Sequence, residues 1–449
     1  MKHVTRLVIV ALTVTVASLS LDARGVPITG VVIDASTREP VRGAIVTAGA
    51  LQTQTDEHGT FRLAVAPDGR IRVRAHGYAR IEVTVGSLTP SSEVALTLLQ
   101  PKALYLSVFG VANRALRDAA LELIDTTELN ALVIDVKGDR GIIGHRSAIP
   151  LAEQIGAQRV ITMPDLAELV ASLRQRGIYT IARIVVFKDD PLASARPDLA
   201  IRRPNGTAYR DRENLSWTDP RKTDVRRYNI EVAREAAQAG FDEIQFDYVR
   251  FPDAQGLAYD VPDTQTSRID AIDGFLREAR EVLAAYNVFV SIDIFGYVCW
   301  NPNDTGIGQQ LERMAETVDY ISPMLYPSSF QFGIPGYRNP VQHPYEIVRL
   351  SLERAVERTG LPPVRFRPWL QAFADYAFGG RSFNAGEIRA QIAAAEDVGT
   401  NGWMLWNPRN RYSSADLDEG GEPIRPGPAG PVGATSLTPL YRKAGRRRQ

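Results

Sequence analysis

Apolar residues follow two different patterns along the chain. Between residues 28 and 99 they alternate with polar residues in short runs, as in Arg70 to Arg74 and Arg80 to Val85, and turn pairs such as Asp68-Gly69 separate the runs. An alternation with a period of two is typical of strands that bury one face. These short, closely spaced strands predict a small β-sandwich at residues 26–99.

From residue 103 onward, short apolar runs alternate with amphipathic segments. Leu166, Leu169, Val170 and Leu173 have the spacing of a helix that packs one face on a sheet. The expected strands are 103–109, 131–136, 179–187, 243–249, 288–295, 320–325, 365–373 and 402–406, with helical patterns at 114–126, 164–176, 222–239, 267–286, 306–317, 344–359 and 386–398. Eight such alternations in about 310 residues predict an α/β fold, a (β/α)8 TIM barrel at residues 103–412. A doubly wound open sheet is the alternative, and polar residues near the ends of almost every strand favour the barrel.

The two ends of the chain fit neither pattern. Lys2 and Arg6 give a basic start, and residues 7–21 are almost entirely apolar or small. A run of about 15 such residues is short for a membrane span and fits a signal peptide, which we place at residues 1–23. We therefore expect an exported protein that is periplasmic, secreted or, if this segment stays uncleaved, anchored at the cell surface. Residues 416–449 are rich in Pro and Gly and have a basic end, which predicts a disordered tail.

Charge and composition exclude several classes of function. Lys and Arg together number 52, as do Asp and Glu, so the chain lacks the basic surplus of a nucleic-acid-binding protein. Cys299 is the single cysteine, which rules out an internal disulfide and a cysteine zinc site, and we expect it to be buried and inert. The barrel has only His145 and His343, and no G-x-S-x-G, G-x-G-x-x-G or Walker sequence follows a strand. We expect no cofactor and no metal.

One extended stretch, Phe241 to Pro252, carries the strongest catalytic candidate. Within it, Gln245 and Asp247 fall on one face of a strand, opposite an apolar face. A carboxylate near the end of a buried strand is costly unless it has partners or a function, and the carboxyl ends of parallel strands hold active sites. The next strand carries Asp293. Glycosidic bond cleavage uses two carboxyl groups, so we expect Asp247 and Asp293 to be the catalytic pair.

Other polar and aromatic residues near the strand ends predict a carbohydrate pocket, because charged and amide groups bind hydroxyls and aromatic rings stack on sugar faces. The candidate substrate-binding residues are Asp135, Lys137, Arg183, Gln245, Arg250, Tyr326, Gln371, Trp406 and Asn407. Of two nearby tryptophans, we expect Trp406 and not Trp403 to face the pocket. We expect Tyr248 to face away from Asp247. A weak site for Mg²⁺ or Ca²⁺ at Asp135, Asp139 and Asp247 is an alternative.

Two sets of motifs resemble known families. The first set comprises Gly30-x-Val32-x-Asp34, Pro40-Val41-x-Gly43-Ala44-x-Val46, Thr55-Asp56-x-x-Gly59-x-Phe61 and Gly77-Tyr78. It resembles the carboxypeptidase regulatory-like (prealbumin-like) sandwich, which implies an accessory module without catalysis. The second set comprises 131–137, 241–252, 291–296, 319–327 and 403–408. It resembles the putative glycosyl hydrolase domain family (DUF4015).

The second resemblance implies a TIM barrel related to the α-amylase-like glycosidases. In those enzymes the nucleophile ends strand four and the general acid/base ends strand five, which corresponds to Asp247 and Asp293. This chain has Gln245 where the amylase pattern has Arg, and Asp293 where it has Glu. The strand-seven His-Asp pair has no counterpart near Trp369 to Phe373.

The sequence thus predicts an exported glycoside hydrolase that acts on a polysaccharide through a carboxylate pair. One alternative is a glycan-binding protein without catalytic activity, which the departures from the amylase pattern and the accessory sandwich motivate. Another alternative is a metal-dependent polysaccharide hydrolase or deacetylase. Beyond the N-terminal segment, we expect no membrane span and no nucleic-acid partner.

Overall fold

Eight parallel strands close into a barrel. The computed structural model describes residues 26–66, 69–87 and 92–418. The barrel strands are β8 (Lys102–Leu106), β9 (Ala131–Lys137), β10 (Tyr179–Val185), β11 (Glu243–Asp247), β12 (Phe289–Phe295), β13 (Tyr320–Met324), β14 (Trp369–Gln371) and β15 (Trp403–Trp406). Because β15 pairs in parallel with β8, the sheet has no edge. This closure confirms the predicted TIM barrel and excludes the alternative of a doubly wound open sheet.

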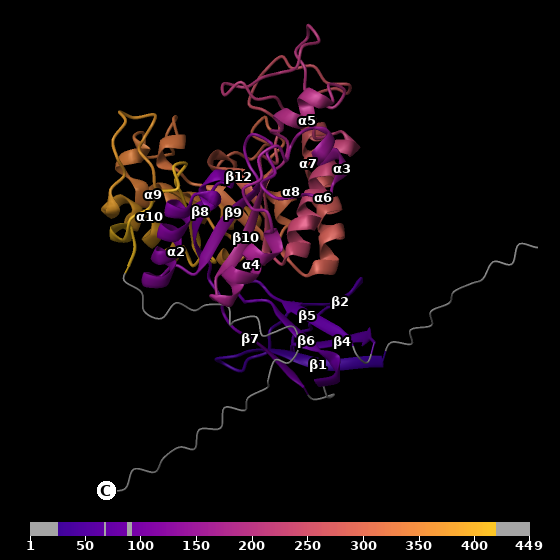
Figure 1. Ribbon diagram of the computed structural model, residues 1–449. Helices are drawn as coiled ribbons and strands as arrows, with labels where there is room; N and C mark the ends of the chain where they lie inside the picture. The colour runs from indigo at the N-terminus through magenta and orange to yellow at the C-terminus, as the bar shows by residue number, and fades with distance from the viewer. Residues whose placement is uncertain (1–25, 67–68, 88–91, 419–449) are drawn as a thin grey trace, which may run out of the picture.

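Helices alternate with these strands and surround the barrel (Figure 1). The longer ones are α2 (Arg114–Thr126), α4 (Leu166–Gln175), α6 (Thr223–Ala239), α7 (Gln265–Leu283), α9 (Pro344–Thr359) and α10 (Ala385–Val398). Shorter α-helices are α1 (Val108–Ala112), α3 (Pro150–Gln154), α5 (Asp190–Ala195) and α8 (Leu311–Ala315). Single 3-10 turns lie at Val85–Ser87, Ala284–Tyr286, Gly296–Cys299, Pro327–Ser329, Pro340–Gln342, Pro363–Arg365 and Ser414–Asp416. None of the helices in the described ranges has the length and apolar character needed to cross a bilayer.

Local sequence explains where these helices begin and end. The side chain of Asn113 caps α2 and that of Asp165 caps α4, each by accepting a backbone N–H of the first turn. Gly240 ends α6 in the left-handed conformation, with φ of 104°, which lets the chain reverse directly into β11. The position of Asp247 at the end of β11 therefore follows from the helix stop at Gly240.

The N-terminal unit is a small β-sandwich of two sheets. One sheet contains β4 (Thr60–Val65), β1 (Val26–Asp34) and β7 (Glu93–Leu96). The other contains β3 (Leu51–Gln54), β2 (Ile45–Ala48), β5 (Arg70–Arg74) and β6 (Ile81–Thr84). Val32, Val46, Phe61 and Val73 are buried between the sheets, as the alternating pattern predicts.

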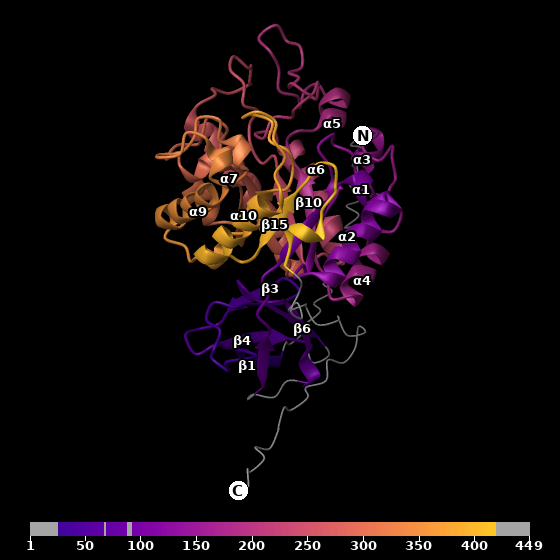
Figure 2. The same cartoon turned by 90° about the vertical axis from the view of Figure 1, so that its left-hand side faces the viewer.

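This sandwich packs against the amino end of the barrel, below it in both views (Figures 1 and 2). Arg80 donates to the carboxylate of Asp242, just before β11, at 3.0 Å. The backbone N–H of Gly77 donates to the hydroxyl of Tyr320, at the start of β13, at 3.0 Å. The opposite, carboxyl end of the barrel stays free for a substrate.

Cys299 is fully buried and unpaired. Burial raises the pKa of its thiol to about 12, so the reactive thiolate is scarce at neutral pH and the residue is an inert part of the core. The predicted signal peptide at residues 1–23 and most of the predicted tail at residues 416–449 lie outside the described residues.

Candidate active site

A cavity of about 640 Å³ opens at the carboxyl end of the barrel. Its walls combine charged, amide and aromatic side chains, which is the composition expected of a carbohydrate site. The lining residues are Asp139, Arg183, Arg212, Glu213, Asp247, Tyr248, Arg250, Asp293, Phe295, Met324, Tyr326, Ser329, Trp369, Phe373, Ala374, Tyr376, Trp406, Asn407, Pro408 and Arg409.

Arg183, on β10, organises the floor of this cavity. Its guanidinium donates to Asp135 at 2.6 Å, to Asp139 at 2.9 Å and, through Nε, to Asp247 Oδ2 at 2.9 Å. The guanidinium carbon also lies 4.8 Å from the ring centre of Trp406. A buried guanidinium with several carboxylate partners has a fixed orientation, so Arg183 fixes the position of the Asp247 carboxylate.

Asp247 ends β11, and Asp293 lies near the end of the neighbouring strand β12. The paired register of β11 and β12 runs from Glu243 opposite Phe289 to Phe246 opposite Ile292. One further position along this register places Asp247 opposite Asp293. Arg183 Nε lies 2.9 Å from Asp247 Oδ2 and 3.9 Å from Asp293 Oδ2, which places these oxygens within about 7 Å of each other. This upper limit on one pair of oxygens is compatible with the spacing of about 5 Å between the carboxyl groups of retaining glycosidases.

Asp293 has the environment of a protonated acid. Its Oδ1 accepts a hydrogen bond of 2.7 Å from Trp369 Nε1, and its Oδ2 has no hydrogen-bond partner among the described residues. Burial, followed by the neighbouring charge of Asp247, raises the pKa of Asp293 well above its usual range, against the opposing effect of Arg183. A raised pKa keeps this carboxyl group protonated to higher pH than an ordinary Asp, which suits a proton donor in the cavity.

Tyr248 directly follows Asp247 and does not continue the strand. Its φ is 50°, in the left-handed region that non-glycine residues rarely adopt, and its N–H donates to Asp247 Oδ1 at 2.5 Å. This conformation breaks the alternation of the strand, so Tyr248 lines the cavity, and the expectation that it faces away from Asp247 is wrong. Strained backbone of this kind is concentrated at functional sites.

Five of the nine expected substrate-binding residues line the cavity beside the two acids: Arg183, Arg250, Tyr326, Trp406 and Asn407. Trp403, by contrast, is fully buried on the other face of β15. Burial, followed by the charges of Asp293 and Asp247, raises the pKa of Tyr326, whose hydroxyl therefore stays protonated beside the acids. The amide of Asn407 donates to the carbonyls of Ala372 and Arg411, so it mainly orders the segment after β15.

The other four expected binding residues do not line the cavity. Asp135 lies behind Arg183 and also accepts from Tyr105 at 2.6 Å, and burial raises its pKa to about 6. Gln371 bonds to Ser328, through which it supports the loop after β13.

Lys137 and Gln245 are fully buried. The pairing of β9 with β10 shifts after Asp135, and this irregularity turns Lys137 outward, where it bonds to Asp189 and to Asn229 of α6. Gln245 lies inside the barrel below the cavity and donates to Ser322 Oγ at 3.3 Å. Both are therefore structural partners in this fold.

Several cavity residues lie outside the predicted set. Arg212 and Glu213 come from the long segment after α5, and Arg409 from the segment after β15. Phe373 and Tyr376 stack with ring planes 8° apart, and Tyr376 is 58% exposed, so it offers a flat aromatic surface at the mouth. No periodic pattern marks loop residues, so the sequence gives no signal for them.

The proposed cation site at Asp135, Asp139 and Asp247 is occupied by a protein cation, since all three carboxylates bind Arg183. Within the described ranges, no three His, Cys, Asp or Glu residues are grouped to hold a metal ion. A metal at this position would have to compete with a buried guanidinium.

Comparisons with known proteins agree with the barrel. A family model described as a putative glycosyl hydrolase domain (DUF4015) matches residues 103–412. The glycoside hydrolase domain of PgaB (BpsB) from Bordetella bronchiseptica is 15% identical, with a TM-score of 0.52, over 72% of this chain and 99% of that one, which shows a shared fold. A hypothetical protein from Ruminiclostridium thermocellum is 37% identical over 42% of this chain and 96% of its own, with a TM-score of 0.38. A chitinase from Chromobacterium violaceum is 12% identical over 70% of this chain and 96% of its own, with a TM-score of 0.43. No curated protein matches the chain.

Proposed function

Because the chain belongs to the putative glycosyl hydrolase domain family, we propose that it is an exported glycoside hydrolase that cleaves glycosidic bonds in a polysaccharide. The carboxyl pair carries the proposal: Asp247 is bound by Arg183, while Asp293 has a raised pKa and an unpaired oxygen. Two neighbouring carboxyl groups in unlike environments suit an acid and a nucleophile. Export rests on the basic and apolar N-terminal segment.

In the first step, the carboxylate of Asp247 attacks the anomeric carbon while Asp293 donates its proton to the departing glycosidic oxygen. The bond to the leaving sugar breaks, and the glycosyl group becomes an ester of Asp247. In the second step, the Asp293 carboxylate takes a proton from water, whose oxygen attacks the same carbon and releases the sugar. Both side chains return to their starting states, and one water molecule is consumed per bond.

The remaining cavity residues suit the binding and positioning of sugars. Arg183 and the N–H of Tyr248 fix the two oxygens of Asp247. The rings of Trp406 and Tyr376 line the cavity and can stack on sugar faces. A polysaccharide suits an open, aromatic-lined cavity of this volume better than a small ligand that must be fully enclosed.

Substrates with different leaving groups distinguish the roles of the two acids. On a panel of 4-nitrophenyl glycosides, whose phenolate leaves without protonation, Asp293→Asn should keep a rapid first release of 4-nitrophenol, because only the second step then needs Asp293, and Asp247→Asn should lose at least about a thousandfold. On natural polysaccharide both variants should lose sugar release. Asp304→Asn is a suitable control, because Asp304 is a buried acid that pairs with Arg268 away from the cavity. Sugar release by Asp247→Asn at the wild-type rate would contradict the assignment.

A further inference from the structure

Four arginines at or beside the mouth of the active site have no acidic partner among the described residues. Arg212, Arg250 and Arg409 line the catalytic cavity, and Arg411 lies in the segment after β15. We call these four the rim arginines. None of them forms an ion pair with Asp or Glu within residues 26–66, 69–87 and 92–418. The whole chain has equal numbers of acidic and basic residues, so this unpaired positive charge is a local feature.

None of the acids that line the same cavity is a partner of the rim arginines among the described residues. Asp139 and Asp247 bind Arg183, and Glu213 bonds to Lys188 at 2.8 Å. Burial, followed by the charge of Asp247, raises the pKa of Asp293 and so favours its neutral form. Because Asp135, Asp139 and Asp247 share the single guanidinium of Arg183, the floor keeps a net negative charge, while the rim carries positive charge that has no acidic partner among the described residues.

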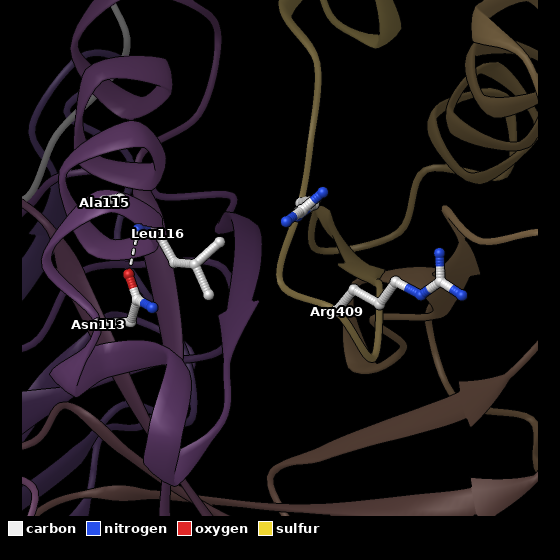
Figure 3. Close-up of a pocket in the computed structure, with 5 residues that line it drawn as sticks. Asn113, Ala115, Leu116 and Arg409 are labelled. Carbon is white, nitrogen blue, oxygen red and sulfur yellow. Dashed lines mark hydrogen bonds between the residues drawn. The ribbon is translucent and has the colours of Figure 1, made fainter.

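The positive rim continues into a second cavity of about 430 Å³. This cavity lies between the start of α2 and the segment after β15, and it is lined by Asn113, Ala115, Leu116, Arg409 and Arg411. Figure 3 shows Arg409 across the gap from Asn113 and Leu116. Because Arg409 lines both cavities, the two are neighbours, and a chain that leaves the catalytic cavity here meets a second guanidinium at Arg411.

We propose that the substrate is an anionic polysaccharide whose carboxylate or sulfate groups bind the rim arginines. The inference rests on the proposed glycoside hydrolase function and specifies its substrate class. A guanidinium binds either anion through two parallel hydrogen bonds, and an unpaired one does so without first breaking an ion pair. Arg250 already has a fixed orientation, stacked 4.9 Å from the ring centre of Trp217.

The opposite charges of floor and rim also determine which sugars carry the anionic groups. At the floor, a negative substituent would lie beside the carboxylates of Asp139 and Asp247 and would be repelled. At the rim it meets Arg212, Arg409 or Arg411. The charged sugars therefore flank the cleaved bond, toward the second cavity, and the sugar on the floor is uncharged.

Binding to matched polymers tests this inference. The full-length Asp247→Asn variant, which does not turn over, is titrated with polygalacturonate and its carboxyl-reduced neutral form, and with dextran sulfate and dextran. The charged member of at least one pair should bind at least about tenfold more tightly, and the preference should fall as salt rises from about 50 to about 500 mM. The pair that shows the preference distinguishes carboxylate from sulfate.

Charge-removing variants locate the site. Adding Arg409→Gln and Arg411→Gln should reduce the preference about tenfold or more and leave binding of the neutral polymers unchanged. Arg62→Gln, on the exposed face of β4, removes the same charge from the sandwich and should have no effect. The inference is overturned if neither charged polymer is preferred, or if the double variant keeps the preference, or if Arg62→Gln reduces it equally. Hydrolysis of a neutral glycan without any charge preference would overturn this inference alone, whereas a charge preference without hydrolysis would overturn the proposed activity alone.

Discussion

Arg183 and Gln245 occupy paired positions on β10 and β11. In the amylase-like pattern an arginine stands two residues before the nucleophile, where this chain has Gln245. The structure supplies that guanidinium from the neighbouring strand at the same level of the barrel, and it reaches Asp247 at 2.9 Å. Asp247 therefore has a cationic partner, although Gln245 stands where the amylase pattern has an arginine.

Removal of this guanidinium should be severe for both stability and activity. Arg183→Met leaves Asp135, Asp139 and Asp247 without the cation that they share, and we expect the free energy of unfolding to fall by about 3–5 kcal/mol. Sugar release should fall below detection because Asp247 loses its position. Urea unfolding and an activity assay measure the two effects. Arg114→Met is the control, since the Arg114 side chain is 89% exposed and Asp118 is its one ion-pair partner among the described residues. A change within about 0.5 kcal/mol is expected.

The pH dependence of hydrolysis should report Asp293. A carboxyl group with a raised pKa stays protonated to higher pH, so activity should be present below that pKa and should fall as the pH rises through it. On 4-nitrophenyl glycosides this alkaline loss should be absent from Asp293→Asn, which cannot ionise. An alkaline limb of unchanged position in Asp293→Asn would assign the acid role to another group.

The left-handed conformation of Tyr248 gives a matched pair of variants. Tyr248→Ala and Tyr248→Gly both remove the ring from the cavity, but only glycine adopts a φ of 50° without strain. Tyr248→Gly should therefore be more stable than Tyr248→Ala by about 1 kcal/mol in urea unfolding, and both should bind glycan more weakly. Equal stability of the two variants would mean that the backbone relaxes when the ring is lost.

Asp319 should connect the sandwich to the barrel in a pH-dependent way. Although burial opposes it, the charges of Arg74, His76 and Arg280, at 3.6, 3.6 and 3.5 Å, lower the pKa of Asp319. A carboxyl group whose pKa is lowered by folding stabilises the folded protein at pH values above the pKa of the unfolded state, which is near 3.8. This contribution to the free energy of unfolding is lost progressively as the pH falls below that value. Asp319→Asn should destabilise the protein by about 3–5 kcal/mol at pH about 7 and by clearly less at pH about 3. A difference that does not change with pH would rule out an electrostatic origin.

The sequence predicts the barrel and the nearness of Asp247 and Asp293 because both follow simple periodic rules. Alternation along the strand puts Asp247 on the inner face, and pairing of neighbouring strands brings Asp293 beside it. The same rule fails at Lys137, because the irregular pairing of β9 reverses the face of that residue. It fails at Tyr248 because the backbone becomes left-handed there. Whether a strand has such an irregularity depends on tertiary packing, and a local sequence pattern carries no information about that packing.

The loop residues of the cavity could not be predicted for a different reason. Arg212, Tyr376 and Arg409 lie in segments without periodicity, and only the closure of the barrel brings these segments to one mouth. The charges of Arg212 and Arg409 and the exposed ring of Tyr376 can be recognised as parts of one site only when the carboxyl ends of the strands are placed together.

The role of Asp247 as the nucleophile is the central claim, and trapping the covalent intermediate tests it most directly. Wild-type protein is incubated with the 2-deoxy-2-fluoro form of an active glycoside, which slows release of the glycosyl group, and the digested protein is examined by mass spectrometry. We predict one glycosyl adduct, located on Asp247 and absent from Asp247→Asn. An adduct on another residue, or none while the parent glycoside is hydrolysed, would contradict the claim.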